Sequence, residues 1–248
     1  MFVNSWETQN LLGNINRETG VDLLLLGLVG SRAYGLDNEE SDYDYRGIYV
    51  GFTAHVLSVT RKPKPVLTSN VPNDCVVYEV EKFLSLAFAN NPNILEMLFL
   101  PEFQYTSCHY PESFRKLIQA RRMLLSQRVK RTYSGYAISQ FKRLQTREAD
   151  GLEGFKSKVK KRYHKHALHT FRLLQQGTEI LRTGDLTVKV PNPEELKEIS
   201  LLPREELYAR VEDEVEKFDK IETDLPPEPN IQYFERWLRD LRLGHHLK

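Results

Sequence analysis

The stretch LVGSRAYGLDNEESDYDYRGIYV, residues 28–50, decides how this sequence is interpreted. An apolar segment, VDLLLLGLVG, ends at Gly30 and Ser31, and Asp42 and Asp44 follow after a polar interval. A strand that turns into a helix through Gly-Ser can present backbone N–H groups and a hydroxyl to an anion. Glycine also lets a phosphate approach the backbone closely. The stretch therefore predicts a phosphate-binding turn beside a pair of carboxylates.

The two aspartates are one residue apart at the start of DYDYRGIYVG, which is rich in aromatic and β-branched residues and so favours a strand. Side chains at positions i and i+2 of a strand point to the same face, so Asp42 and Asp44 are expected side by side. Adjacent carboxylates repel each other unless a cation lies between them. A hard divalent cation, Mg²⁺ or Mn²⁺, suits such oxygen ligands and also bridges substrate phosphates. A third carboxylate from another strand would complete a site for two ions.

The chain of 248 residues is long enough for two domains, and its pattern changes near residue 103. Before that point strands and helices alternate, which predicts a compact α/β domain over residues 1–103. After it the pattern is helical, with a break expected near Gly135 and a helix end at Gly184, so residues 104–248 are predicted to form a helical domain. The expected strands are 21–30, 42–51 and 74–80; the expected helices of the first domain are 5–20, 81–91 and 92–101; the expected loop is 61–73.

The composition is that of an ordinary soluble globular protein, with 40% hydrophobic and 28% charged residues. The longest apolar run is about ten residues, too short to span a bilayer. No basic region followed by an apolar core opens the chain, so no signal peptide is expected. Cys75 and Cys108 form neither a disulfide framework nor a zinc-binding spacing. We expect a cytoplasmic protein without a membrane partner.

The net charge of +1 conceals a strongly basic segment. Residues 115–172 contain 17 Lys or Arg against three acids, a net +14, which favours a phosphate-rich partner such as RNA. Solvated helix faces remain the alternative explanation. Within this segment Lys165, His169 and Arg172 recur at helical spacing on one face, so they are candidates to hold a triphosphate or the acceptor, or else form a solvent-facing stripe.

Four motifs carry a resemblance that reaches from about residue 28 to residue 199. They are GSRAYGLDNEESDYDYRGIYV, YEVEKFLSLAFANNPNILEMLFLP, YHKHALHTFRLLQQG and LRTGDLTVKVPNPEELKEI. In this order they resemble the successive motifs of RlaP/YcgL-type predicted nucleotidyltransferases, within the DNA polymerase β-like superfamily. The resemblance implies a polymerase β-like α/β (α+β) domain with a small mixed sheet, followed by a helical domain.

The resemblance also implies the reaction and its residues. A nucleoside monophosphate would pass from an NTP, ATP among the candidates, to an acceptor hydroxyl, with pyrophosphate released and two Mg²⁺ or Mn²⁺ ions bound. Gly30 and Ser31 match the phosphate-binding turn of the family, and Arg32 is a candidate nucleotide contact. Asp42 and Asp44 match the metal ligands. A later family motif is matched by Lys165, His169 and Arg172.

The third carboxylate has two candidates, Asp74 and Glu79. Asp74 is the choice, because the family tends to carry an acid just before the corresponding VVY stretch; Glu79 is the alternative. Five residues separate them, so a regular strand would direct them to opposite faces. Glu96 is expected to be structural.

The acceptor implied by the resemblance and by the basic segment is RNA. Two alternatives stay open: AMP transfer to a partner protein, as in antitoxin-type members of the superfamily, and a non-catalytic RNA-binding module. The preferred NTP, the acceptor itself and the oligomeric state are not predicted.

Overall fold

The leucine-rich run Asp22–Val29 forms strand β1 of a five-stranded sheet in the computed structural model, which describes residues 22–69, 73–149 and 157–245. Leu24, Leu25 and Leu26 have no exposed surface. A strand that is apolar on both faces requires a position inside the sheet with both faces covered. Strand β1 lies inside the sheet, between two antiparallel neighbours, β2 (Asp44–Val50) and β5 (Tyr105–Thr106). Its consecutive buried leucines alternate between the two faces, so both faces are covered.

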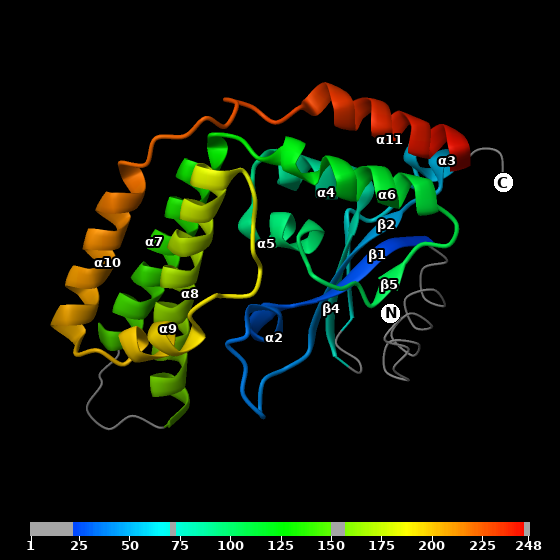
Figure 1. Ribbon diagram of the computed structural model, residues 1–248. Helices are drawn as coiled ribbons and strands as arrows, with labels where there is room; N and C mark the ends of the chain where they lie inside the picture. The colour runs from blue at the N-terminus through cyan, green and yellow to red at the C-terminus, as the bar shows by residue number, and fades with distance from the viewer. Residues whose placement is uncertain (1–21, 70–72, 150–156, 246–248) are drawn as a thin grey trace. The chain divides into compact units, whose positions relative to one another are not determined.

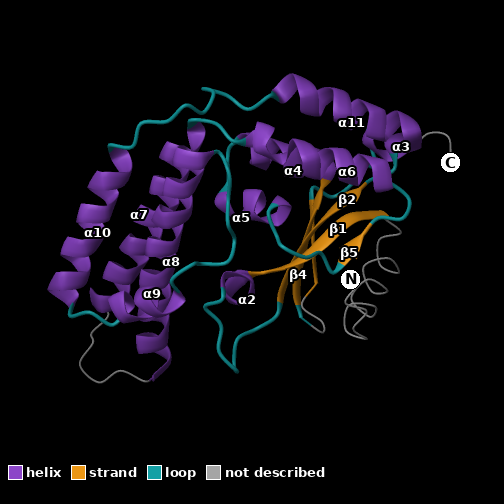
Figure 2. Cartoon of the chain, viewed as in Figure 1, coloured by secondary structure: helices purple, strands orange, loops and turns teal. Residues whose placement is uncertain are grey.

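The sheet has the strand order β3-β4-β2-β1-β5 (Figure 2, orange). Strand β4 (Asp74–Glu79) runs parallel to β2, and β3 (Val66–Ser69) runs antiparallel to β4. The fold is therefore α/β with a small mixed sheet, as predicted. The parallel pairing of β2 with β4 matters most for function, because it brings the first residues of both strands to the same edge of the sheet.

Some local predictions were wrong. Residues 61–73 were expected as a loop, but Val66–Ser69 pair with β4 as strand β3. The short strand β5 was not expected at all. Strand β2 begins at Asp44, so Asp42 precedes the strand. The predicted helix 5–20 lies outside the described residues.

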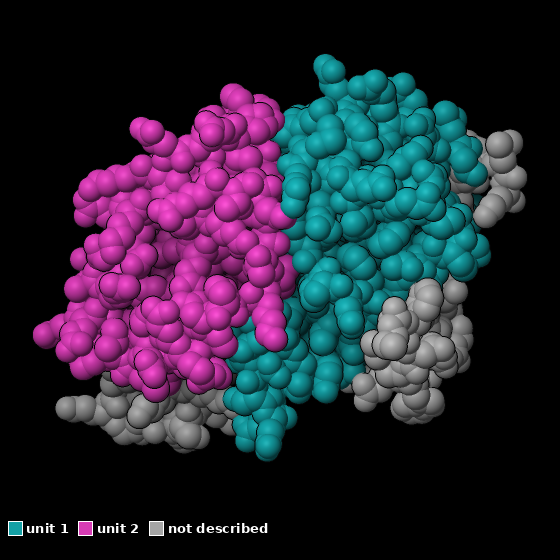
Figure 3. Space-filling model, in the orientation of Figure 1, with its two compact units in different colours: residues 1–89, 93–124, 229–248 teal, residues 90–92, 125–228 magenta. Residues whose placement is uncertain are grey.

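The chain forms two compact units, coloured separately in Figure 3. The first contains the sheet, and the second is helical. The sequence predicts a division at residue 103, whereas the first unit also includes residues 104–124 and 229–248 and leaves out residues 90–92. The helices of the first unit are α2 (Gly30–Tyr34), α3 (Thr53–Val56), α4 (Val80–Phe88), α5 (Pro92–Leu95, whose first residue is assigned to the second unit), the 3-10 helix η1 (Glu96–Leu98), α6 (Pro111–Ala120), the 3-10 helix η2 (Arg121–Leu124) and α11 (Ile231–His245).

Helix α11 joins the first unit through contacts distant in sequence. The Trp237 indole donates a hydrogen bond to the Ser113 carbonyl on α6 at 3.0 Å. Phe234 is fully buried and meets Phe88 of α4 edge to face. Figure 1 shows helix α11 running alongside α4 and α6. Near the end of the helix, Arg242 donates to the Gly51 carbonyl at 2.6 Å. These tertiary contacts, rather than sequence proximity, place the C-terminal helix with the sheet.

The second unit consists mainly of four helices: α7 (Arg128–Ala149), α8 (Ser157–Thr183), α9 (Pro193–Ser200) and α10 (Arg204–Asp219). Helix α8 ends as predicted, because Gly184 adopts a positive φ of 65° and its N–H bonds to the Ile180 carbonyl. The expected break near Gly135 was wrong, since α7 runs through that exposed glycine. A helical glycine costs only about 1 kcal/mol relative to alanine, which a long packed helix tolerates. No helix among the described residues is both long enough and apolar enough to cross a membrane.

Glu79 stabilises the first unit at the end of β4. It is 5% exposed, forms an ion pair with Arg242, and accepts hydrogen bonds from the backbone N–H groups of Gly51 and Glu81. The Glu81 contact caps the start of α4, so one carboxylate joins the sheet, helix α4 and helix α11.

We therefore expect Glu79→Gln to lower the free energy of unfolding by about 3–5 kcal/mol, because Arg242 would remain buried without its counter-charge. Urea denaturation followed by circular dichroism measures this effect. Glu81→Gln, at an exposed position two residues away, is the matched control and should change stability by less than about 0.5 kcal/mol. Equal, small effects of the two substitutions would contradict the structural role of Glu79.

Candidate active site

Gly30, at the end of β1, lies in close contact with Asp44, at the start of β2. Its φ is +74°, a conformation that other residues rarely adopt. A Cβ atom at this position would lie only 2.5 Å from Oδ2 of Asp44. The backbone angle favours glycine, and any larger residue would also have to displace the Asp44 carboxylate from its present position. The Gly-Ser turn and the second aspartate of the DxD sequence are consequently in direct proximity.

Asp44 and Asp74 are register partners in the parallel pair β2–β4. Register partners on adjacent strands lie about 5 Å apart and direct their side chains to the same face. Both residues line a pocket of about 360 Å³. The further lining residues of this pocket are Tyr45, Arg46, Thr68, Cys75 and Val76. Asp42 precedes β2 by two residues and is exposed.

Glu79 lies at the opposite end of β4, where its register partner is Tyr49. Five residues along a strand correspond to about 17 Å, so Glu79 is remote from the Asp44–Asp74 pair. Its carboxylate is engaged by Arg242. The geometry therefore favours Asp74 over Glu79 as the partner of Asp44.

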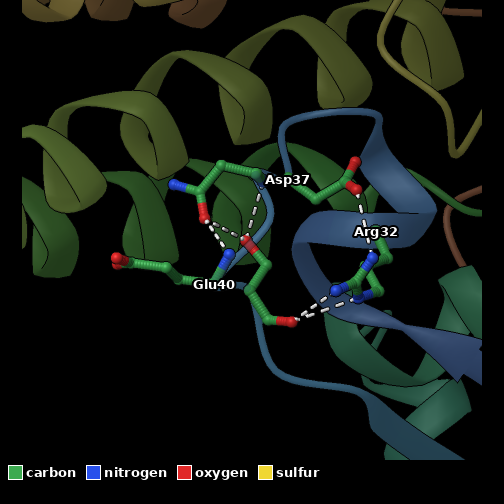
Figure 4. Close-up of polar contacts among 5 residues, drawn as sticks. Arg32, Asp37 and Glu40 are labelled. Atoms are coloured by element: carbon green, nitrogen blue, oxygen red, sulfur yellow. Dashed lines mark hydrogen bonds and ion pairs between the residues drawn. The ribbon is translucent and has the colours of Figure 1, made fainter.

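Arg32 organises the segment that leads to Asp42 (Figure 4). Its guanidinium donates to the Ser41 carbonyl from Nη2 at 2.7 Å and from Nε at 3.2 Å, and Nη1 reaches Asp37 at 3.4 Å. The same group lies 3.9 Å from the centre of the Tyr43 ring. These contacts hold the loop between α2 and β2, and the contact of Arg32 with a nucleotide stays a prediction.

The buried Glu96 forms an ion pair with the half-buried Arg46, which lines the pocket, and this pairing was not predicted. Arg46 Nη1 lies 2.8 Å from Glu96 Oε1. Burial, the largest single influence, lowers the pKa of Arg46, but the Glu96 carboxylate together with Tyr34, Tyr78 and Asp44 outweighs it, so the pKa is raised above its ordinary value. Fifty residues separate the partners, so no local sequence pattern could have revealed the pair.

The described residues contain no cluster of three His, Cys, Asp or Glu side chains that would hold a metal on its own. Asp42, Asp44 and Asp74 are nevertheless carboxylates, the ligands that Mg²⁺ and Mn²⁺ prefer. Mg²⁺ characteristically uses one or two protein carboxylates and takes its other ligands from water and substrate phosphates. The donor set therefore fits a cation that is bound together with a nucleotide.

Lys165, His169 and Arg172 belong to helix α8 in the second unit, and they do not share one environment. Lys165 is exposed, His169 is half-buried and Arg172 is buried. Burial, reinforced by the charges of Arg172, Lys165 and His166, lowers the pKa of His169 to about 3, so the imidazole is neutral at pH 7. Arg172 Nη1 donates to Gln176 at 2.7 Å, and Gln176 donates to the carbonyls of Thr187 and Val188. Arg172 therefore has a structural contact within its own unit.

Comparison with known proteins identifies the family. The family model described as "RlaP: RNA repair pathway DNA polymerase beta family" matches residues 6–238. The uncharacterized protein YcgL of Bacillus subtilis is 32% identical over 108 residues, which cover 43% of this chain and 41% of that protein.

A solved structure of a nucleotidyltransferase-like protein from Exiguobacterium sibiricum aligns with 96% of this chain and 76% of its own. Its sequence identity is 11% and its TM-score is 0.31, a similarity too low to carry an inference. The family match, in contrast, covers nearly the whole sequence. This chain belongs to the RNA repair pathway DNA polymerase beta family, RlaP.

Proposed function

We propose that this protein transfers a nucleoside monophosphate from an NTP to an acceptor hydroxyl in a reaction that depends on Mg²⁺ or Mn²⁺. The observation that carries the proposal is the pairing of Asp44 with Asp74 across parallel strands, with the Asp44 carboxylate against Gly30. Membership of a DNA polymerase beta family supports this reaction class. Asp42, two residues earlier and exposed, would complete the set of oxygen ligands.

In this reaction the acceptor oxygen attacks the α-phosphorus as the bond to the β-phosphate oxygen breaks. The hydroxyl proton leaves to solvent, and pyrophosphate departs with the electron pair. The bound cations would lower the pKa of the attacking hydroxyl and stabilise negative charge on the phosphates. Asp42, Asp44 and Asp74 would hold the cations, and the turn at Gly30 and Ser31 would bind the triphosphate. Correct alignment of the two substrates supplies a further large part of the rate enhancement.

We propose RNA as the acceptor. The family description places its members in an RNA repair pathway, and residues 115–172 carry a net charge of +14. One nucleotide does not need that much positive charge, whereas a polynucleotide does. Helix α7 exposes Arg131, Lys142 and Arg143 within this segment. AMP transfer to a protein and binding of RNA without catalysis are the competing functions.

The aspartates provide the first test. Asp44→Asn and Asp74→Asn should each reduce transfer of label from α-³²P-NTP by about 100-fold or more, because each removes charge that balances the cations in the transition state. EDTA should abolish transfer, and added Mn²⁺ should restore it. Glu81→Gln is the matched control, since it removes an exposed carboxylate just after the end of β4. Full activity of Asp44→Asn would refute the proposed site; full activity of Asp74→Asn would remove Asp74 from it.

The acceptor is tested by charge reversal. The triple variant Arg131→Glu/Lys142→Glu/Arg143→Glu should bind a fluorescein-labelled RNA hairpin about ten-fold or more weakly at 50 mM salt, because fewer counterions are released on binding. The control reverses three exposed basic residues of the acidic helix α10 and its end, Arg210, Lys217 and Lys220, with the same change of net charge. Fluorescence anisotropy measures both affinities. Equal losses in the two triple variants would show a general charge effect and would count against this RNA surface.

A further inference from the structure

Glu96 is a buried acid whose two oxygens bind two different elements of the active-site region. It lies in the 3-10 helix η1 and is 1% exposed. Oε2 accepts a hydrogen bond from the Tyr34 hydroxyl at 2.7 Å, and Oε1 accepts one from Arg46 Nη1 at 2.8 Å. Removing a carboxylate from water costs several kcal/mol, so such a residue needs strong local compensation.

The two partners of Glu96 come from the elements that carry the site. Tyr34 ends helix α2, four residues after Gly30, and is itself 3% exposed. Arg46 follows Asp44 by two residues on β2. One carboxylate therefore connects the helix that begins at Gly30 to the strand that carries Asp44. It holds the two elements whose residues Gly30 and Asp44 are in close contact.

Arg46 presents a problem for a cation site. Residues 44 and 46 of a strand share a face, and Arg46 lines the same pocket as Asp44 and Asp74. A guanidinium is a good bidentate partner for a carboxylate, so it can compete with a metal ion for the aspartates. Both hydrogen bonds that Arg46 makes with the described residues use Nη1, one to Glu96 and one to the Asn93 carbonyl at 3.2 Å. Glu96 thus holds the guanidinium and balances its charge.

We propose that Glu96 is a positioning residue that keeps Arg46 from competing with the divalent cation for Asp44 and Asp74. This inference rests on the proposed function, because it requires a cation at those aspartates. Glu96 touches neither the nucleotide nor the metal and acts through Arg46. If the Glu96–Arg46 pair were only a structural ion pair, its loss would change stability but not the metal affinity of the folded protein.

The test measures Mn²⁺ binding by electron paramagnetic resonance in the presence of a saturating non-hydrolysable NTP analogue, with the analogue alone as the blank. Wild type, Asp44→Asn, Glu96→Gln, and the double variant Glu96→Gln/Arg46→Met are compared, each checked for folding by thermal melting. Glu96→Gln keeps the size and an acceptor oxygen but removes the charge. The expected result is a dissociation constant for Mn²⁺ about ten-fold or more higher in Glu96→Gln, because an unbalanced cation then faces the aspartates. The double variant should return to within about two-fold of wild type, because the competing guanidinium is gone.

The outcomes separate this inference from the proposed function. Wild-type Mn²⁺ binding that Asp44→Asn does not weaken would refute the metal site itself, and the inference with it. Binding that depends on Asp44 but is unchanged in Glu96→Gln, or equally weak in the single and double variants, would overturn the inference alone. If Glu96→Gln melts below the assay temperature, all four proteins are compared in trimethylamine N-oxide, which favours the folded state.

Tyr34→Phe tests the other hydrogen bond of Glu96, the one that its Oε2 accepts from the Tyr34 hydroxyl. This variant removes one hydroxyl and leaves the Glu96–Arg46 pair in place. Mn²⁺ affinity should stay within about two-fold of wild type, because the guanidinium remains balanced. A loss as large as that of Glu96→Gln would mean that general loosening of the region, rather than the charge of Arg46, controls metal binding, and would overturn the proposal.

Discussion

The contact between Gly30 and the Asp44 carboxylate is the constraint on which the site depends. Oδ2 of Asp44 occupies space that any side chain at position 30 would need. The residue that follows strand β1 also has a positive φ of 74°, so a glycine suits this position best. The antiparallel register of β1 and β2 brings Asp44 to this glycine by pairing it with Val29. The parallel register of β2 and β4 then brings Asp74 to the same position.

Two buried carboxylates, Glu79 and Glu96, stabilise the two ends of the β2–β4 pair in different ways. Glu79 lies at the end remote from the aspartates and connects the sheet to helix α11 through Arg242. Glu96 connects helix α2 to β2 through Tyr34 and through Arg46, which follows Asp44 by two residues. Both acids pair with arginine, and only Glu96 has a partner that lines the pocket of Asp44 and Asp74. This difference in position is why stability is the expected role of Glu79 and metal affinity that of Glu96.

The sequence predicted the elements whose signals are local. The apolar run of β1, the turn at Gly30 and the end of α8 at Gly184 each follow from residue type and spacing, and the structure contains all three. The α/β class and the family were also predicted and are confirmed. The choice of Asp74 over Glu79 stays a prediction, which the register of β2 with β4 now supports.

Features that depend on distant contacts could not be predicted. Helix α11 belongs with the sheet because of Trp237 and Arg242, whose partners lie more than 100 residues away. Helical spacing and the family motif single out Lys165, His169 and Arg172, but neither shows that Arg172 is buried and bonded to Gln176. Arg32 likewise lies in the expected motif but contacts its own loop. In each case the side-chain partner, which tertiary packing selects, determines the role.

The central claim, that Asp44 and Asp74 hold a divalent cation with a nucleotide, is tested most directly by crystallography. Crystals grown with Mn²⁺ and a non-hydrolysable NTP analogue would be measured at a wavelength where manganese scatters anomalously. The account predicts an anomalous peak in direct contact, at about 2.0–2.3 Å, with carboxylate oxygens of Asp44 and Asp74 and with phosphate oxygens of the analogue. A nucleotide bound elsewhere, or manganese at Glu79 and absent from Asp44 and Asp74, would contradict it.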